Sequence, residues 1–474
     1  MNQYKLYIGG EFATTNQKLV VNNPFNNDIV GETFLAGSNE LEKAIEKATA
    51  VKKEMRDLPA FKRYDVLTEI AKKIDAGKDE LALILAKEAG KPLKYALGEI
   101  KRAVQVFIVA AEESKRLPKE YLSIDWTPAG EGKEGLVKYF PIGLIAGISP
   151  FNFPLNLAVH KIAPAIASGN PIILKPARST PLSVLELAKI IDQTDLPKGA
   201  FSVIPMDREA GNQLVTDERI NMLSFTGSPE VGWKMKANAG KKKVALELGG
   251  NAGVIVSDKS DTDLAVKKCL VGGYAYSGQV CIHVQRIYVQ EKVFDDFIDK
   301  FIEGTKKLKF GAPDEDGTDI SVMIDEDNAK RVEEWVGEAV EEGAKILLGG
   351  KRKGSYYEPT IITNTKKQMK VCALEIFGPV VTVEKYKDFS EAIYHVNDSE
   401  YGLQAGVFTN TINEMNEAFN ELEVGGVIIN DVPTFRVDHM PYGGVKNSGF
   451  GREGVKYSIF EMLEPRILVK NNDY

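Results

Sequence analysis

Short apolar segments alternate with helical segments between residues 141 and 228, and this alternation restricts the fold more than any other feature of the chain. Short strands that alternate with helices are typical of a parallel, doubly wound sheet. In such a sheet, ligands bind beyond the carboxyl ends of the strands. We therefore predict an α/β fold with strands at 141–150, 171–176, 201–205 and 220–228, separated by helices at 154–168, 181–193 and 210–215.

Residues suited to chemistry follow three of these strands. Asn152 comes after the first strand, and Lys175 lies at the end of the second. After the last strand, Gly227 lets the backbone approach a ligand, Ser228 is suited to cap the next helix, and Pro229 suits its first position. A helix N-terminus exposed in this way binds phosphate, although Ser-Pro-Glu also begins many helices that bind no ligand.

A buried acid and a cysteine mark the segment 244–281. Glu247 lies in an apolar strand, where a carboxylate costs several kcal/mol unless it is paired, protonated or used in catalysis. Cys281 follows a Ser-Gly-Gln loop, which exposes a thiol enough for reaction. The two residues fit a general base that serves a covalent nucleophile. Taken alone, they fit a satisfied buried acid and a core cysteine equally well.

The bulk composition narrows the class of protein. A chain of 474 residues is too long for one core, so at least two lobes are expected. The chain is 43% hydrophobic and 27% charged with a net charge of −7, which indicates a folded soluble protein and argues against a nucleic-acid partner. We find no signal-peptide pattern at the start and no uncharged run of about 18 apolar residues, so no membrane partner is expected.

Cysteine and histidine content bears on the redox compartment and on metals. Cys269, Cys281 and Cys372 are an odd number without metal-like spacing. We therefore expect neither a disulfide framework nor a zinc site, and the expected location is a reducing cytoplasm. The four histidines are scattered along the chain, so no metal site is predicted.

A helical region precedes a protruding hairpin. Ser38 is expected to cap the first helix. Residues 121–140 have the pattern of an exposed β-hairpin, whose free edges proteins usually cover. We interpret it as a subunit-contact arm that pairs with the last strand of a neighbouring subunit, within residues 459–470; a flexible surface hairpin is the alternative. Further helices are predicted at 60–76, 79–89 and 94–116.

Residues 449–454 match the G-x-G-x-x-G dinucleotide fingerprint, but their context is wrong for it. No predicted strand leads into the motif, and only twenty residues follow it, too few to complete a βαβ unit. We interpret the motif as a loop that needs backbone freedom. A nicotinamide cofactor would instead place its pyrophosphate at the helix that begins near Ser228.

The chain resembles the aldehyde dehydrogenase superfamily over nearly its full length. The resemblance rests on the ordered motifs SPFNFP, LKPA, FTGSPEVG, LELGG, GQVC, EIFGPV and PYGGVKNSGFGREG. It implies a Rossmann-like cofactor domain, an α/β catalytic domain and a β-hairpin oligomerisation arm, in a homodimer or homotetramer. The expected ranges are 1–120, 139–246 and 432–452 for the cofactor domain, 247–431 for the catalytic domain, and 121–138 and 453–474 for the arm.

The resemblance also implies a catalytic role for each reactive residue. Cys281 would attack the aldehyde carbon to form a thiohemiacetal, while Asn152 and the backbone N–H of Cys281 would hold the oxyanion. Removing one such donor typically costs about 2.7–4 kcal/mol of transition-state stabilisation. After hydride transfer to the nicotinamide, Glu247 would activate the water that hydrolyses the thioester.

The implied cofactor is NADP or NAD. Lys175 would bond the adenosine ribose, Ser228 the pyrophosphate and Glu375 the nicotinamide ribose. Phe377 would lie against the nicotinamide ring. The alternatives are core packing for Phe377 and a surface salt bridge for Glu375. Further residues expected at the cofactor are Ser149, Phe151, Gly227 and Leu248.

One departure from the family pattern bears on the choice of cofactor. Relatives that prefer NAD often carry an acid three residues after the lysine of the LKPA motif, where this chain has Arg178. An acid there would bond the ribose hydroxyls and repel a 2′-phosphate, whereas arginine would attract the phosphate. We therefore hypothesise that NADP is accepted; an Arg178 side chain directed to solvent is the competing interpretation.

The resemblance points to a small polar or anionic aldehyde such as lactaldehyde or glyceraldehyde 3-phosphate. Arg102 and Arg436 lie where relatives that act on phosphorylated, phosphono- or hydroxy-aldehydes resemble this chain, and arginine suits bidentate binding of anionic groups. Arg102 fits a helix-surface ion pair equally well. Val280 departs from some phosphate-accepting members, which carry arginine next to the nucleophile. Phe153 and Ile282 complete the expected substrate residues.

Three other functions remain open at this point. One is a broad-specificity aliphatic aldehyde dehydrogenase. Another is a CoA-acylating semialdehyde dehydrogenase, which Glu247 disfavours because it supplies a base for water. The last is a non-catalytic structural protein on the same fold, which would have no need to keep Cys281, Asn152 and Glu247 together.

Overall fold

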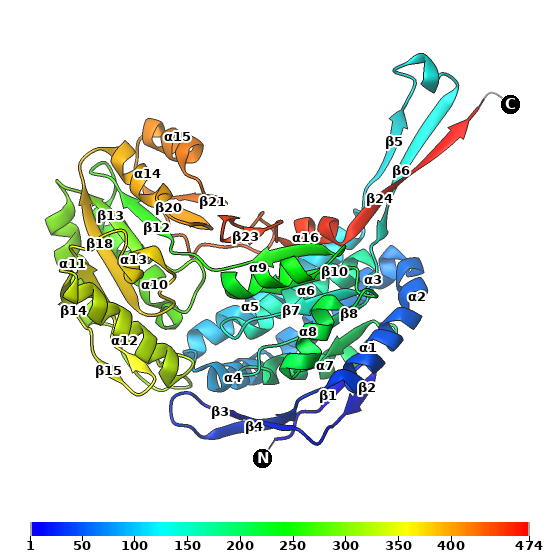
Figure 1. Cartoon of the computed structure of the whole chain (residues 1–474), viewed down its shortest axis with the longest axis horizontal. Coiled ribbons are helices and arrows are strands. Elements are labelled where there is room, and N and C mark those ends of the chain that lie inside the picture. The colour runs from blue at the N-terminus through cyan, green and yellow to red at the C-terminus, as the bar shows by residue number, and fades with distance from the viewer. Residues whose placement is uncertain (1, 473–474) are drawn as a thin grey trace.

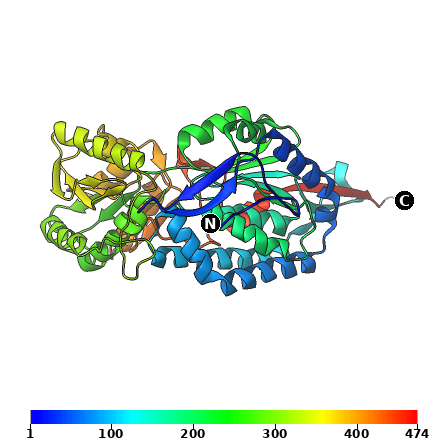
Figure 2. The same cartoon turned by 90° about the horizontal axis from the view of Figure 1, so that it is seen from below.

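The chain forms two lobes from which a β-arm projects, in a computed structural model that describes residues 2–472 (Figure 1). The larger lobe contains the N-terminal half of the chain, and the smaller lobe follows it in sequence. The arm extends away from both lobes (Figure 2). Within residues 2–472, no helix is both long and apolar enough to cross a lipid bilayer.

The larger lobe is built on an eight-stranded sheet. Its five central strands are parallel, and antiparallel strands border them on both sides. This arrangement confirms the predicted doubly wound α/β fold. The strand order is β2 (Glu11–Ala13), β1 (Leu6–Ile8), β9 (Phe201–Val203), β8 (Ile172–Lys175), β7 (Ile145–Ile148), β10 (Met222–Thr226), β11 (Lys243–Glu247) and β23 (Gly449–Phe450).

Helices cover both faces of this sheet because successive strand residues point to opposite sides. On β8, for example, Ile172 and Leu174 pack into one core and Ile173 into the other. The first core is closed by α3 (Ala60–Ala76), α4 (Lys78–Ala89), α5 (Leu93–Ser114), α6 (Pro154–Ser168), α7 (Leu182–Asp192) and α16 (Val455–Glu461), and the second by α1 (Ser38–Ala50), α8 (Arg208–Thr216) and α9 (Pro229–Asn238).

Two predicted helix caps differ from the structure. Ser38 is the first residue of α1 rather than its cap; Gly37 precedes the helix, and the Glu40 carboxylate accepts the Gly37 N–H at 2.9 Å. The glutamate reaches back to the free backbone donor, so no hydroxyl is needed there. Ser228 does precede α9 as predicted, but within the described structure its hydroxyl makes no capping bond.

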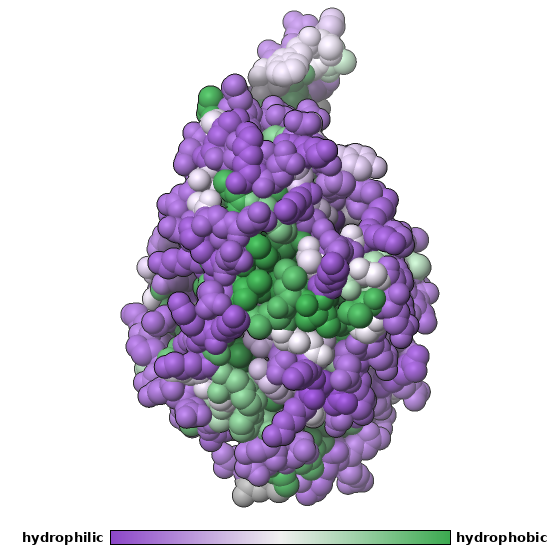
Figure 3. Space-filling model, turned by 90° about the vertical axis from the view of Figure 1, so that its left-hand side faces the viewer, coloured by the Kyte–Doolittle hydropathy of each residue, from purple (hydrophilic) through white to green (hydrophobic). Residues whose placement is uncertain are grey.

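The smaller lobe holds a seven-stranded sheet, parallel except for the edge strand β14. Polar side chains cover most of the outer end of this lobe, with an apolar patch near its centre (Figure 3). The strand order is β14 (Lys345–Leu348), β17 (Thr360–Thr363), β18 (Val380–Tyr386), β13 (Arg286–Gln290), β12 (Gly253–Val256), β20 (Gln404–Phe408) and β21 (Gly426–Ile429). The helices are α10 (Thr262–Tyr274), α11 (Phe294–Lys306), α12 (Glu326–Glu341), α13 (Lys370–Ala373), α14 (Phe389–Asn397) and α15 (Ile412–Glu421).

Short elements connect these parts. The hairpin β3 (Lys18–Asn22) and β4 (Ile29–Phe34) runs beneath the larger lobe in Figure 1. The remaining elements are α2 (Lys52–Asp57), the 3-10 turns η1 (Pro128–Gly130) and η2 (Ala275–Gly278), and the two-residue strands β15 (Arg352–Lys353), β16 (Tyr356–Tyr357), β19 (Tyr401–Gly402) and β22 (Val445–Lys446).

The arm is a three-stranded antiparallel sheet with β6 (Lys133–Pro141) between β5 (Lys119–Ser123) and β24 (Leu463–Asn471). The predicted pairing of the last strand with a neighbouring subunit is therefore wrong, because β24 pairs with β6 of its own chain. The pairing begins with Leu463 opposite Pro141, directly after α16, so the chain reaches its own hairpin without a linker. β5 and β24 are left as the free edges.

We propose the three-part division that the sequence predicts, with one adjustment. The two large sheets and the arm draw their strands from the three sets of expected ranges. Residues 455–462, expected in the arm, instead pack with α5 and α6 in the larger core, so only β24 extends into the arm. Residues 1, 473 and 474 of the expected ranges lie outside the described residues.

Candidate active site

A cavity of about 640 Å³ collects the residues that follow three neighbouring strands. Parallel pairing aligns β7, β10 and β11, so that Thr226 lies opposite Glu247 at the edge where the strands end. The site therefore lies where a doubly wound sheet is expected to bind ligands. Of the predicted residues, the cavity wall includes Phe151, Asn152, Gly227, Ser228, Glu247, Leu248, Cys281, Glu375 and Phe377.

The other predicted residues lie outside this wall. Phe153, Val280 and Ile282 form an apolar cluster around Cys281, together with Leu403 and Tyr442. The remaining ones are Ser149, Lys175, Arg178, Arg102 and Arg436.

Cys281 is delivered to the cavity by a strained turn. Tyr276, Ser277 and Gly278 all have positive φ, at 50°, 54° and 69°. Such backbone costs about 1–3 kcal/mol at each non-glycine residue, and two anchors hold it. The Tyr276 hydroxyl donates to the Ala89 carbonyl at 2.9 Å, and the Ser277 hydroxyl donates to the Ser321 carbonyl at 2.9 Å.

Gly278 is required in this turn by close packing as well as by its φ. A Cβ there would lie 2.1 Å from the carbonyl oxygen of Gly378. The turn is thereby pressed against the segment that carries Glu375 and Phe377, so the nucleophile and the far wall of the cavity are fixed relative to each other.

The thiol of Cys281 is partly buried and protonated at neutral pH. Burial raises the pKa of Cys281 to about 11, although a hydrogen bond from Tyr442 works in the opposite direction. The sulfur lies 3.2 Å from the Tyr442 hydroxyl. Because the thiolate is the nucleophilic form, the site needs a proton acceptor when it reacts.

Asn152 lies beside the loop that carries the cysteine. Its Nδ2 donates to the Gln279 carbonyl at 2.9 Å, and its Oδ1 accepts the Phe153 N–H at 3.1 Å. One N–H of the amide thus orients the side chain toward the Cys281 loop. The second N–H remains available to an oxygen in the cavity.

Glu247 is a buried acid with a strong affinity for a proton. Burial, followed by the negative charge of Glu453, raises the pKa of Glu247 well above its ordinary value. Its Oε1 faces Gly443, where a Cβ would come within 3.0 Å, and its Oε2 has no hydrogen-bond partner within the described residues. An unpartnered buried carboxylate oxygen that faces a cavity can bind water.

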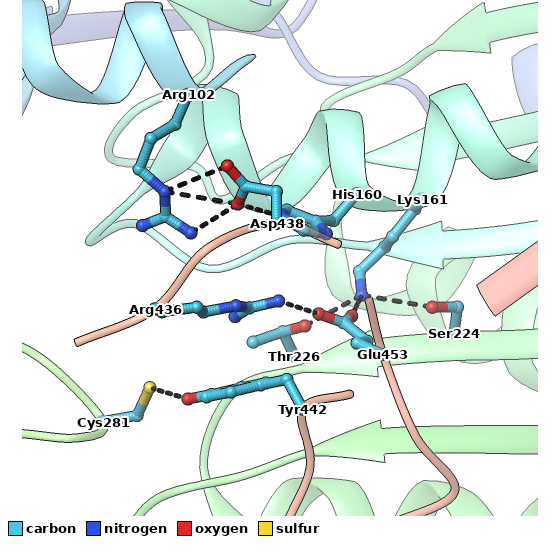
Figure 4. A network of polar contacts seen from close by, with 10 residues as sticks. All are labelled: Arg102, His160, Lys161, Ser224, Thr226, Cys281, Arg436, Asp438, Tyr442 and Glu453. Carbon is cyan, nitrogen blue, oxygen red and sulfur yellow. Dashed lines mark hydrogen bonds and ion pairs between the residues drawn. The ribbon is translucent and has the colours of Figure 1, made fainter. Parts of the chain in front are cut away.

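A buried ionic network lies behind the cavity (Figure 4). Lys161 Nζ donates to Glu453 at 3.1 Å and to the hydroxyls of Ser224 and Thr226. Arg436 Nη2 donates to the second oxygen of Glu453, also at 3.1 Å. Burial alone would raise the pKa of Glu453. The positive charges of Lys161 and Arg436 have the larger effect and lower that pKa below its ordinary value. Glu453 is therefore the stronger acid of the two, and Glu247 holds its proton more tightly.

Both predicted substrate arginines already have acidic partners. Arg102 makes a forked contact with Asp438, with Nη2 at 2.6 Å, and Asp438 also contacts His160 Nε2 at 2.8 Å. This is the ion-pair alternative for Arg102. The Arg436 guanidinium lies 3.6 Å from the centre of the Tyr442 ring, and its Nε is buried without a partner within the described residues. Arg436 thus keeps one unused donor close to Tyr442 and Cys281.

The cofactor side of the cavity has the polarity that a nicotinamide dinucleotide requires. Burial raises the pKa of Glu375 to about 8. The Gly250 N–H, which donates to this carboxylate at 3.1 Å, acts in the opposite direction and lowers the pKa. Its other oxygen lies beside Gly249, where a Cβ would come within 2.0 Å, so only glycine leaves room for the acid. Phe377 packs edge-to-face on Phe151 at 5.8 Å. An acid for ribose hydroxyls, an apolar wall and the free N-terminus of α9 fit such a cofactor.

Lys175 and Arg178 lie close together at the end of β8. Burial and then the charge of Arg178 lower the pKa of Lys175. Arg178 itself is exposed, and no ion pair to it occurs within residues 2–472. His283, in contrast, packs behind the site: its Nε2 lies 2.9 Å from the Gly273 carbonyl, and burial lowers its pKa to about 4.

Sequence reasoning missed several residues of the site. Tyr442 and Glu453 both lie in the PYGGVKNSGFGREG motif. The interpretation of that motif rested on the spacing of its glycines and assigned no role to these two side chains. Lys161 could have been found as a lysine on the apolar helix 154–168, every residue of which is buried. Arg331 and Trp335 of α12 also line the cavity, and no motif marked that helix. Within the described residues, no group of three or more His, Cys, Asp or Glu side chains could hold a metal ion.

The chain is similar to known proteins over almost its whole length. Residues 12–468 match the model of the Aldehyde dehydrogenase family. The chain is 45% identical to the 3-sulfolactaldehyde dehydrogenase of Priestia aryabhattai, covering 99% of this chain and 98% of that one. Aldehyde dehydrogenase 21 from Physcomitrella patens, solved in complex with the reaction product succinate, is 44% identical with a TM-score of 0.98, covering 100% and 99%.

A third similar protein was solved with a dinucleotide. It is the glyceraldehyde-3-phosphate dehydrogenase GapN from Methanocaldococcus jannaschii, complexed with NADP, at 40% identity and a TM-score of 0.92, covering 96% of this chain and 100% of that one. The family model matches almost the whole chain, and the similar proteins are well above 30% identical to it; together these findings establish the family. The chain belongs to the aldehyde dehydrogenase family.

Proposed function

We propose that this enzyme oxidises a small anionic aldehyde to its carboxylic acid with NADP or NAD, using Cys281 as nucleophile, Asn152 as oxyanion donor and Glu247 as base. The observation that carries the proposal is the contact chain from Arg436 through Tyr442 to Cys281. It puts a cation with an unused N–H one side chain away from the thiol.

The first step is addition of the thiol to the aldehyde. The sulfur bonds to the carbonyl carbon, the thiol proton passes to water in the cavity, and the carbonyl oxygen gains negative charge. Asn152 Nδ2 and the backbone N–H of Cys281 are suited to receive that oxygen. Because the thiol pKa is about 11, the oxyanion donors are needed to make addition favourable.

NADP or NAD, when bound, supplies the hydride acceptor. Glu375 and Phe377 would hold the nicotinamide end and Ser228 the pyrophosphate, with Ser149, Phe151, Gly227 and Leu248 along the wall. Lys175 and Arg178 would meet the adenosine ribose. The exposed guanidinium of Arg178 has no acidic partner in the described structure, so it is free to pair with a 2′-phosphate.

Glu247 completes the cycle by hydrolysis. Its raised proton affinity makes it an effective base for water. Water gives one proton to the ionised Glu247 carboxylate and adds to the thioester carbon. The C–S bond then breaks, the carboxylic acid is released, and the proton returns from Glu247 to the thiolate. The unpartnered Oε2 of Glu247 is the atom suited to that water.

Relatives from methanogens are named for lactaldehyde, a small polar aldehyde without charge, and three other similar proteins favour an anionic substrate. Their names refer to 3-sulfolactaldehyde, succinate and glyceraldehyde 3-phosphate, which all carry an acidic group. Arg436 is the cation that supports this class here. Phe153, Val280 and Ile282 surround the thiol with apolar side chains and would hold the short carbon chain of the substrate. Arg102 is bound to Asp438, and the charge of Asp438 in turn acts on Arg436.

We also propose a homodimer or homotetramer in the cytoplasm. Ile467, Leu468 and Val469 on the edge strand β24 are 49–52% exposed, and consecutive apolar residues on a free strand edge suit a protein partner. The three cysteines are free, which fits a reducing compartment. Light scattering of the purified protein measures the number of subunits.

A matrix of aldehydes and cofactors tests the proposal. Reduced nicotinamide is followed with 3-sulfolactaldehyde, glyceraldehyde 3-phosphate, lactaldehyde and propanal, each with NADP and with NAD. We expect the highest kcat/KM for an anionic aldehyde, and Arg436→Lys to raise KM for it without affecting propanal. Equal kcat/KM for propanal would contradict the substrate class. Stimulation by coenzyme A would contradict hydrolysis.

A further inference from the structure

A second cavity of about 690 Å³ lies at the base of the arm. Its wall is formed by the end of α2, the start of α3, the end of α5 and the last residues of β6. It shares no lining residue with the catalytic cavity. Figure 1 shows α2 and α3 at this position, where the arm leaves the larger lobe. Any ligand here would act apart from the chemistry at Cys281.

Arg63 is a buried cation without a counter-ion at this cavity. The residue is only 8% exposed, yet within the described residues its side chain forms no ion pair, and its Nε lacks any hydrogen-bond partner. Its Nη1 lies next to Gly169, where an added Cβ would come within 3.1 Å of it. A buried charge is costly unless it is paired, so the guanidinium requires an anion that this part of the chain does not supply.

The start of α3 adds backbone donors to the same cavity. Leu58, Pro59 and Ala60 line the wall, and α3 runs for 17 residues from Ala60. In the described structure its first turn has neither an acidic residue nor a side-chain cap. The first N–H groups of a helix have no partner within it, and they face an anion favourably. Arg63 lies in this first turn, so its side chain and the free N–H groups belong to one site.

The charge of the remaining wall is also positive. Lys115, Lys119 and Lys138 line the cavity. Among the described lining residues Asp57 is the one carboxylate, and Arg56 already binds it at 3.0 Å. The wall therefore carries a surplus of cations over acids.

We propose that this cavity binds a phosphate group, free or as part of a small metabolite, between Arg63 and the N-terminus of α3. Planar guanidinium and helix N–H groups are the donors that phosphate prefers. The bound anion would join the larger lobe to the root of the arm, because β6 contributes Lys138 to the same wall. It would act as a structural anion that stabilises the arm.

The test uses the whole enzyme and inorganic phosphate as the probe. Calorimetric titration should give one site per chain, and the melting temperature should rise with phosphate more than with sodium chloride at equal ionic strength. Arg63→Met should remove both effects and keep kcat/KM. Arg116→Met, which changes an exposed arginine at the end of α5, should keep both effects.

Two further outcomes would overturn the proposal. Phosphate that binds the catalytic cavity would compete with the aldehyde, and its effect would persist in Arg63→Met. A partner subunit's carboxylate at Arg63 would give no phosphate effect in the parent enzyme and a smaller assembly for the variant by light scattering. If Arg63→Met does not fold, Arg63→Lys should bind phosphate several-fold more weakly. Pyrophosphate and ATP titrations then tell free phosphate from a metabolite.

Discussion

The hydroxyl of Tyr442 and the sulfur of Cys281 lie 3.2 Å apart, next to the apolar side chains of Phe153, Val280, Ile282 and Leu403. This contact is the hydrogen bond that favours the thiolate against burial. Tyr442→Phe should therefore raise the pKa of Cys281 and slow its alkylation at pH 8 by about tenfold, the effect of a shift of roughly one unit. The rate of iodoacetamide labelling against pH measures the change.

The control for this prediction is Tyr401→Phe. Tyr401 lines the same cavity as Cys281, but within the described residues no hydrogen bond joins its hydroxyl to the thiol, so the alkylation profile should keep its midpoint. Identical profiles for Tyr442→Phe and the parent enzyme would show that the contact does not stabilise the thiolate.

Glu247→Gln should separate oxidation from hydrolysis. Without a base for water, the thioester would accumulate, so one equivalent of reduced nicotinamide per active site should appear in a burst. The steady rate should then fall by ~10²–10⁴-fold, the usual contribution of a general base. Stopped-flow absorbance measures the burst, and Cys281→Ala should give none. A slow linear trace without a burst would assign Glu247 to the first step instead.

Glu375 should make the folded protein less stable as the pH rises from about 4.5 toward 8. Its folded-state pKa of about 8 lies above the ordinary 4.5, so the folded protein holds this proton more tightly than the unfolded chain. Its contribution is full below pH 4.5 and is lost as the pH rises toward 8, by at most about 1.4 kcal/mol per pH unit. Glu375→Gln removes this loss, so the variant should gain stability relative to the parent between pH 5 and pH 8. Urea unfolding at both values measures the difference, and an unchanged difference would contradict the prediction.

Arg178→Glu should lower the preference of the enzyme for NADP over NAD. The exposed guanidinium would lose its pairing with a 2′-phosphate, and the new acid would repel it. The ratio of kcat/KM for NADP over NAD should fall by about tenfold, which corresponds to roughly 1.4 kcal/mol. Arg178→Gln should give an intermediate ratio, and added salt should shrink the effect of both. A ratio that does not move would leave Arg178 as a solvent-directed side chain.

The sequence predicted the parallel sheet closely because each strand is short, apolar and bounded by helices with clear periodicity. The helices predicted at 154–168 and 60–76 match the structure at both ends. The motifs also placed Asn152 and Glu247 at strand ends, which parallel pairing brings to one cavity, and they placed Cys281 on a loop that lines the same cavity. Local patterns were sufficient for these strand-end residues because the pairing of parallel strands brings the strand ends together at one edge of the sheet.

Other features depended on contacts that no local pattern encodes. Asp438 lies far from Arg102 and His160 in the chain, and only folding brings the three together. The sequence analysis predicted that the hairpin pairs with the last strand of a neighbouring subunit, whereas β6 pairs with β24 of the same chain. A sequence pattern can show that a hairpin has a free edge, but it does not show which strand covers that edge. The pKa of Glu247 is raised first by burial and then by the charge of Glu453, which lies more than two hundred residues away in the chain.

The antiparallel contact of β23 with β11 places part of the active site late in the chain. Gly449 lies opposite Glu247, and the segment between Arg436 and Glu453 supplies Tyr442 and the acidic partner of Lys161. These residues leave the ribosome after all the parallel strands of both lobes. A nascent chain that ends before Arg436 therefore contains those strands but lacks the contacts of Tyr442 with Cys281 and of Glu453 with Lys161.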